Sequence, residues 1–291
     1  MQDFAYHAPT TLADATALLA QHNGRAKILA GGTDILVQLR EGLRVADVVI
    51  DVKRIPELLR LELSPQGLRL GASVPCYQLY ENAQVKQAYP ALTDSARIIG
   101  GWQIQSRASI GGNLCNSSPA GDSTPSLIVL DAVAVIVGAT GTREVPVRDF
   151  CTAPGRNVLL PGELMSTIVL PPPAANSGSA YERFIPRNEM DIAVVGAAAW
   201  IQLNAAGDKI AAARIAVGSV APTPKYAEAA SQSLVGQSPS EAAFAAAGEL
   251  AKQVAAPITD MRGTVEYRTH LVSVLVKRTL ITALDRARAS S

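Results

Sequence analysis

Two glycine pairs in this sequence stand among small residues that can donate hydrogen bonds. The first is Gly31-Gly32, followed by Thr33 and Asp34, and the second is Gly111-Gly112 within SRASIGGNLCNSSPAGDST, residues 106–124. Glycine allows positive φ and a close approach of the backbone, whose free N–H groups can bind a phosphate. A single pair is typical of an ordinary turn or helix start. Two pairs predict two loops that close on one extended anion, such as the diphosphate of a dinucleotide.

Asp122, at the far end of the second segment, has two interpretations. Its carboxylate can accept hydrogen bonds from ribityl or ribose hydroxyls. Alternatively, it is the N-cap of a helix in GDSTPSL, a role that Ser123 or Thr124 would fill equally well. The sequence leaves both interpretations open.

The remaining reactive side chains form no catalytic group. The three histidines lie away from any cysteine or paired carboxylate, and no G-x-G-x-x-G, Walker A or G-x-S-x-G pattern occurs. Cys115 has no evident base, so an inert thiol is favoured over a nucleophile. Arg187 and Asp191, ahead of an apolar strand, are typical of a structural ion pair. Any redox or transfer chemistry here therefore comes from a bound cofactor.

Composition excludes several classes of protein. Of the 291 residues, 48% are hydrophobic and 18% are charged, as in a globular protein. A net charge of +1 and an aromatic content of 4% argue against nucleic-acid binding. No secretory signal is evident, and no apolar stretch approaches the roughly 18–20 residues that span a bilayer. Three dispersed cysteines without a C-x-x-C pair favour a reducing, cytoplasmic setting and no metal held by this chain.

The glycine pairs depend on the elements that flank them. Residues 26–30 (AKILA) predict a buried strand that leads directly into Gly31, within a βαβ-like unit. Alternation over 59–73 predicts a hairpin that turns at 64–67, and the proline cluster in 161–176 indicates the boundary of a last domain. The other expected elements are helices from Thr10 or Thr11 to about Gln21 and over 35–43, 76–82, 91–99, 240–255 and 264–289, a strand over 45–51, a short helix and a hairpin within 126–150, and strands at 180–186, 192–203 and 210–219.

The order of five segments resembles one family over essentially the whole chain. These segments are AGGTD, ASIGGNLCNSSPAGDSTP, YERF with RNEMDIA, RIAVGSVAPTP, and DMRGTVEYRTHLVSVLVKR. They are similar to the FAD-binding medium subunit of the molybdenum hydroxylases, the family of xanthine dehydrogenase and carbon monoxide dehydrogenase. The resemblance implies an α+β fold, with a vanillyl-alcohol-oxidase-like (PCMH-type) FAD-binding domain of two subdomains, 1–57 and 58–176. A small C-terminal domain, 177–291, of a three-stranded sheet with helices is expected to follow.

The resemblance also implies which residues contact FAD. Two segments are expected to bind the diphosphate from opposite sides, namely Leu29, Ala30, Gly31, Gly32, Thr33, Asp34 and Ile35, and Ser109, Ile110, Gly111, Gly112 and Asn113. Asp122 is expected at the sugar or ribityl hydroxyls, Ile99 at an apolar contact with the cofactor and Met165 near the adenine. Arg183 stands where the family often has Lys, and Ile192 is expected to approach the flavin ring.

Family membership would make this chain an FAD-carrying electron-transfer subunit. Electrons would arrive from two [2Fe–2S] clusters of a small subunit, after hydroxylation at a molybdopterin cofactor in a large subunit, and leave reduced FAD for an external acceptor. A dimer of heterotrimers is the expected assembly, and no [4Fe–4S] insertion is present. The alternatives are a stand-alone FAD-dependent oxidoreductase of the same fold and a cofactor-free interaction subunit.

Overall fold

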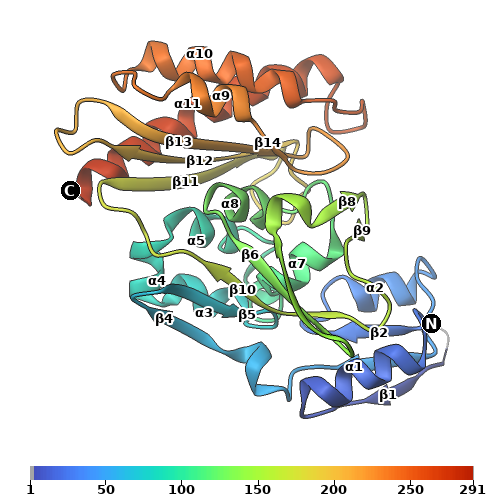
Figure 1. Ribbon diagram of the computed structural model, residues 1–291. Coiled ribbons are helices and arrows are strands. Elements are labelled where there is room, and N and C mark those ends of the chain that lie inside the picture. Colours follow the sequence, from blue (N-terminus) through green and yellow to red (C-terminus); the bar gives the residue numbers. More distant parts are fainter. Residues whose placement is uncertain (1–2, 291) are drawn as a thin grey trace.

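Three sheets follow one another through the molecule, from the N-terminal end to the C-terminal end (Figure 1). The computed structural model describes residues 3–290 of the chain. A fourth, two-stranded sheet is a small hairpin beside the middle unit. Within residues 3–290, no helix is long and apolar enough to cross a membrane.

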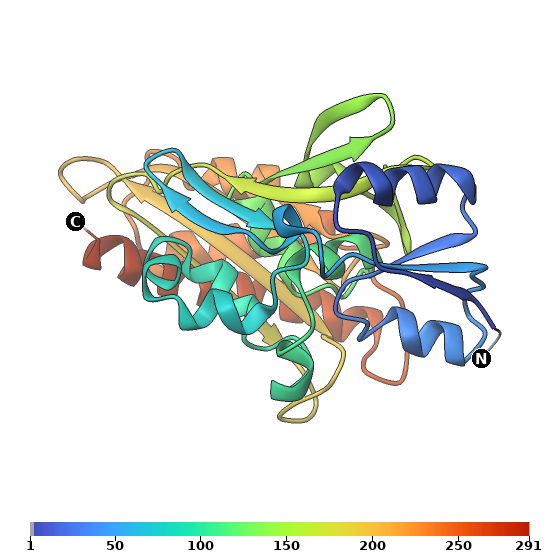
Figure 2. The same ribbon diagram turned by 90° about the horizontal axis from the view of Figure 1, so that it is seen from below.

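The N-terminal sheet is parallel, with strand order β1-β3-β2, so that β2 is an edge strand. Helices α1 and α2 cover its two faces (Figure 2). The side chain of Thr11 accepts a hydrogen bond from the Asp14 N–H and caps α1, which confirms the expected start of this helix. The elements are β1 (Ala5–His7), α1 (Leu12–Gln21), β2 (Ala26–Leu29), α2 (Ile35–Arg40) and β3 (Val48–Asp51).

The middle sheet is antiparallel, with strand order β4-β5-β10-β6-β7. Its central strand, β10, comes from the segment 161–176 that the proline cluster marked as a boundary. The mostly apolar sequence LMSTIVL suits a central strand that is largely buried and pairs with β5 and β6, and the prolines begin only at Pro171. The elements are η1 (Pro56–Leu59), β4 (Leu61–Ser64), β5 (Gly67–Gly71), β6 (Val133–Gly138), β7 (Gly141–Pro146) and β10 (Leu164–Leu170).

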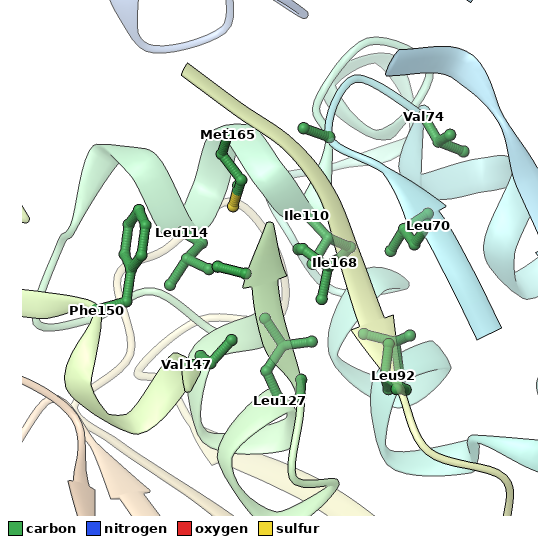
Figure 3. Close-up of a cluster of buried hydrophobic side chains, with 14 of the residues drawn as sticks. Leu70, Val74, Leu92, Ile110, Leu114, Leu127, Val147, Phe150, Met165 and Ile168 are labelled. Atoms are coloured by element: carbon green, nitrogen blue, oxygen red, sulfur yellow. The ribbon is translucent and has the colours of Figure 1, made fainter. Parts of the chain in front are cut away.

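Short helices pack on this sheet and include the second glycine segment. That segment was expected to be a loop, which is wrong, because residues 110–116 form helix α7. Ile110 and Leu114 lie one turn apart and enter the same core cluster as Leu127 and Phe150 (Figure 3). The elements are α3 (Cys76–Glu81), α4 (Ala83–Ala88), α5 (Pro90–Ala96), α6 (Trp102–Gln105), α7 (Ile110–Asn116), α8 (Ser123–Val129), η2 (Val147–Asp149), β8 (Cys151–Ala153) and β9 (Arg156–Asn157).

The C-terminal sheet has the three expected long strands and a fourth strand of two residues, in the order β11-β12-β13-β14. One face is covered by α9, α10 and α11, and the other lies against α5 and α8 of the middle unit (Figure 1). The elements are β11 (Ser177–Phe184), β12 (Val195–Leu203), β13 (Ile210–Gly218), β14 (Lys225–Tyr226), α9 (Glu228–Ser233), α10 (Glu241–Ala251), η3 (Lys252–Val254) and α11 (Val265–Ala289).

Candidate cofactor site

A cavity of about 300 Å³ lies between the edge strand β2 and the middle unit. Its walls come from β2, α2, α7 and β10, which explains why both glycine segments reach it. Of the predicted cofactor residues, eight line the cavity, namely Ala30, Gly31, Gly32, Asp34, Ile35, Gly111, Gly112 and Met165. Its volume is at the lower end of the roughly 300–1,000 Å³ that small-molecule sites occupy.

The first glycine segment presents unpaired backbone donors. Within the described chain, the N–H groups of Gly31, Gly32, Thr33 and Asp34 have no hydrogen-bond partner. Gly32 has φ +82°, a left-handed conformation that a β-branched residue does not tolerate. Four consecutive free N–H groups beside a cavity suit an anionic ligand such as a phosphate.

The second glycine segment lies against the first. A Cβ on Gly31 would collide with the carbonyl oxygen of Arg107, and one on Gly111 would collide with the backbone of Ala72. A residue without a side chain is therefore required at Gly31 and at Gly111, because other backbone segments pack directly against both positions. Gly112 meets only the Ser109 hydroxyl, at 3.0 Å, and is helical, so neither glycine of this pair has positive φ. The expectation of positive φ thus holds for Gly32 only.

The start of α7 adds one further free donor. Ser109 is the N-cap, and its hydroxyl oxygen accepts a hydrogen bond from the Gly112 N–H at 3.0 Å. The N–H of Ile110 faces the Val74 carbonyl in the isolated bridge between Pro75 and Ser109, whereas the N–H of Gly111 has no partner within residues 3–290. Both glycine segments therefore contribute free N–H donors at residues that line the cavity.

Three polar side chains, of Asp34, Gln38 and Asn116, lie beside the first glycine pair, and only Asp34 was predicted. The Asn116 amide donates to Asp34 at 3.3 Å and accepts from the Gln38 amide at 3.0 Å. Burial raises the pKa of the Asp34 carboxyl. Gln38 and Asn116 were missed, although the four-residue spacing of Asp34 and Gln38 places both on one face of α2.

Two cations in the cavity wall were also missed. Lys27 and Arg44 both line the cavity, and neither has a carboxylate within 4.0 Å in the part of the chain described. Burial lowers the pKa of the Lys27 amine, and the nearby charges of Arg44 and Arg25 lower it further. The Lys27 ammonium donates to the Gly24 carbonyl at 2.7 Å. The position of Lys27 on the strand that leads into Gly31-Gly32 is the sequence signal that could have identified this cation.

Another part of the cavity wall is apolar and includes Met165, Ile28, Val52 and Leu164. Cys115 lines the cavity as well, and burial raises the pKa of its thiol to about 12. A thiol with that pKa is almost entirely protonated near neutral pH, so it is a poor nucleophile.

Asp122 and Arg183 lie outside the cavity lining and form a buried ion pair. The Arg183 guanidinium donates to the Asp122 carboxylate at 2.6 Å, and the Tyr181 hydroxyl donates to the other oxygen at 2.9 Å. Burial raises the pKa of Asp122 to about 6, although Arg183 opposes this shift. Asp122 occupies the N-cap position of α8, but its side chain makes no capping hydrogen bond, so that interpretation is wrong.

Other predicted residues flank the site or lie away from it. Ile99 is buried in the middle core, whereas Ile192 is 53% exposed in the connection between β11 and β12. Arg187 and Asp191 lie 3.7 Å apart, which confirms the predicted ion pair. The residues that flank the cavity lining are Leu29, Thr33, Ser109, Ile110 and Asn113.

Comparisons with known proteins give the class and the family of this chain as an FAD-binding subunit. Residues 2–173 match the family model of the FAD binding domain in molybdopterin dehydrogenase. Residues 179–283 match the CO dehydrogenase flavoprotein C-terminal domain. The chain therefore belongs to the FAD-binding medium subunits of the molybdenum hydroxylase family, whose members are oxidoreductases.

Individual relatives are similar over nearly their full lengths. The chain is 35% identical to the xanthine dehydrogenase FAD-binding subunit of Escherichia coli O157:H7 over 290 residues, covering 99% of this chain and 98% of the relative. It is 32% identical to the carbon monoxide dehydrogenase medium chain of Hydrogenophaga pseudoflava over 283 residues, covering 97% and 98%. A solved carbon monoxide dehydrogenase from that organism superposes with a TM-score of 0.94 at 33% identity, covering 98% of each chain. Quinoline 2-oxidoreductase from Pseudomonas putida 86 superposes with a TM-score of 0.91 at 27% identity, also covering 98% of each chain.

Proposed function

We propose that this chain is the FAD-carrying electron-transfer subunit of a molybdenum-containing hydroxylase or dehydrogenase. It accepts electrons from the [2Fe–2S] clusters of a small partner subunit and passes them through FAD to an external acceptor. The observation that carries the proposal is the convergence of two glycine segments on one cavity, with five backbone N–H groups that have no partner among the described residues. That donor set suits a diphosphate and needs no catalytic acid or base from the protein.

Residues of different chemistry would contact different parts of FAD. The free N–H groups of Gly31–Asp34 and of Gly111 face the diphosphate, and Lys27 and Arg44 offset its negative charge. Met165 and the apolar wall take the adenine, while a lone pair of Asp122 accepts from a sugar hydroxyl. The remainder of the cofactor extends beyond the cavity toward Ile192. When bound, FAD supplies the capacity to accept and release electrons.

Partner subunits complete the proposed assembly. The large subunit holds the molybdopterin cofactor and the substrate, the small subunit holds two [2Fe–2S] clusters, and two heterotrimers pair in the cytoplasm. Support comes from the relatives, which are named as medium chains or FAD-binding subunits of dehydrogenases.

Spectroscopy and copurification test this function. Purified protein mixed with FAD should show a flavin absorption band after gel filtration, with about one FAD for each chain. Mass spectrometry of proteins that copurify from the native source should identify the large and small subunits. Absence of the flavin band would refute FAD binding, and turnover of an organic substrate by the isolated chain would favour the stand-alone oxidoreductase.

A further inference from the structure

The loop between α7 and α8, residues 117–122, joins the glycine helix to the C-terminal sheet. Its Pro119 carbonyl accepts a hydrogen bond from the backbone N–H of Ser219, directly after β13, at 2.8 Å. Its Asp122 carboxylate accepts from Tyr181 and Arg183, both on β11. Strand β11 and the residue that follows β13 therefore both hold this loop.

The Arg183–Asp122 ion pair is the shortest of these contacts. Its side chains are 7% and 8% exposed, and the donor–acceptor distance is 2.6 Å. A Cβ at Gly196, which stands opposite Arg183 on β12, would overlap the Tyr181 hydroxyl. The glycine thus leaves the room that Tyr181 needs to reach Asp122. Removing one partner of such a pair leaves an uncompensated buried charge, which is costly.

A short series of contacts continues from Asp122 to the cavity. The next residue, Ser123, donates its hydroxyl to the Asn113 side-chain oxygen at 2.7 Å, and its N–H points to the same oxygen at 3.4 Å. Asn113 directly follows Gly112, which lines the cavity. Arg183 itself does not line the cavity.

We propose that Arg183 is a positioning residue for the FAD site, acting through Asp122, Ser123 and Asn113 on the glycine helix. The C-terminal sheet then sets the position of Gly112 and of the sugar-facing carboxylate of Asp122. This inference rests on the proposed function, because it concerns the same FAD site. It differs from a direct contact of Arg183 with the cofactor, and the two predict different results.

Titration of purified variants with FAD, followed by flavin fluorescence, tests the proposal. We expect Arg183→Met to raise the Kd for FAD by about ten- to hundredfold, and Arg183→Lys, which keeps the charge, by less than about fivefold. Arg278→Met is the matched control, because Arg278 pairs with Glu182, between Tyr181 and Arg183 on β11. This control should bind FAD like the natural chain.

A double-mutant cycle separates the positioning role from direct contact. Asn113→Ala removes the hydrogen bond between Ser123 and Asn113, the last contact in the series. If Arg183 acts through this contact, the double variant should bind FAD no more weakly than the weaker-binding single variant. In the FAD-free protein, amide hydrogen exchange over 110–123 should accelerate in Arg183→Met and stay unchanged in Arg278→Met. If Arg183→Met fails to fold, Tyr181→Phe removes only one hydroxyl and should raise the Kd by about two- to tenfold.

The outcomes distinguish this inference from the function on which it rests. No FAD binding by the natural chain would overturn both. Normal FAD binding by a folded Arg183→Met variant would overturn only the positioning role. Additive effects in the cycle, with unchanged hydrogen exchange over 110–123, would also overturn it and assign Arg183 a direct contact.

Discussion

Gly31 lies against the carbonyl oxygen of Arg107 with no room for a side chain between them. The contact brings the end of β2 to the residues that directly precede the Ser109 cap of α7. Two segments almost eighty positions apart in sequence therefore present their free N–H groups to one cavity. Close packing of backbone, rather than a flexible loop, holds the proposed diphosphate site in shape.

Gly111 and Gly112 should respond differently to alanine, although they are neighbours in one helix. We expect Gly111→Ala to lower the free energy of unfolding by about 1–3 kcal/mol, because its Cβ would collide with Ala72. Gly112→Ala should change that free energy by less than about 1 kcal/mol, since alanine favours a helix and meets only the Ser109 hydroxyl. It should nevertheless weaken FAD binding, because Gly112 lines the cavity. Urea denaturation and FAD titration measure the two effects, and normal FAD binding by Gly112→Ala would contradict the site.

Gly32→Val should abolish retention of FAD through gel filtration. The backbone at Gly32 has φ +82°, and a β-branched side chain would force the segment to rearrange and displace its free N–H groups. Gly207→Val is the control, because Gly207 has φ +74° in the turn before β13 but lies away from the cavity. Both variants should lose stability, whereas only Gly32→Val should lose FAD. Equal retention by the two would contradict the assignment.

Much of this site could be predicted from residue types and order, and the limits have physical causes. Glycine pairs report backbone requirements directly, so Gly31, Gly32, Gly111 and Gly112 were identified from sequence. The helical conformation of α7 was missed because two adjacent glycines disfavour a helix, and the burial of Ile110 and Leu114 outweighs that local cost.

Long-range partners were the harder part of the prediction. Asp122 finds its partners Tyr181 and Arg183 about sixty residues away, and no local pattern gives that pairing. The Lys27 side chain was missed for the same reason, because its role depends on which face of β2 meets the cavity. By contrast, the N-cap of α1 depends on neighbouring residues only; it was predicted at Thr10 or Thr11 and lies at Thr11.

The Glu163–Arg143 ion pair beside the cavity should make stability depend on pH. Arg143 donates two hydrogen bonds to this carboxylate, at 2.7 and 2.8 Å, and they lower the pKa of Glu163. A carboxyl with a lowered folded-state pKa stabilises the fold above its unfolded pKa of about 4.3, and that contribution falls as pH drops through the folded value. Glu163→Gln should cost about 1 kcal/mol at pH 7 and less near pH 3. Urea denaturation at both pH values measures the loss of unfolding free energy. Glu62→Gln is the control, because Glu62 forms an exposed ion pair with Arg60.

The Cys115 thiol should react slowly in the folded protein. With a pKa of about 12, roughly one thiol in ten thousand is ionised at pH 8. We expect labelling of Cys115 by a disulfide reagent to be far slower than in urea-unfolded protein, and slower still with FAD bound. Peptide mapping by mass spectrometry identifies the labelled cysteine. Rapid labelling of the native protein would show that this wall of the cavity opens to solvent.

Lys27 and Arg44 should account for part of the salt dependence of FAD binding. Both line the cavity without a carboxylate partner among the residues described, and the charges of Arg44 and Arg25 lower the pKa of Lys27. An anionic ligand would relieve that repulsion, so binding should raise the Lys27 pKa and take up a fraction of a proton at alkaline pH. Lys27→Met and Arg44→Met should each weaken FAD binding by about 1–2 kcal/mol at low salt and reduce its dependence on salt.

Two controls test whether Lys27 and Arg44 act on the negative charge of the ligand, namely a ligand without phosphate and a variant of a neighbouring arginine. Riboflavin lacks phosphate, so its binding should be unaffected by either change, whereas ADP should lose affinity as FAD does. Arg25→Gln removes a neighbouring charge that is exposed and already paired with Asp47, so its FAD affinity should stay within about twofold of the natural chain. Titration calorimetry in two buffers of different ionisation enthalpy measures affinity and proton uptake together. Equal losses for riboflavin and FAD would show that Lys27 and Arg44 support the fold of the cavity rather than the charge of its ligand.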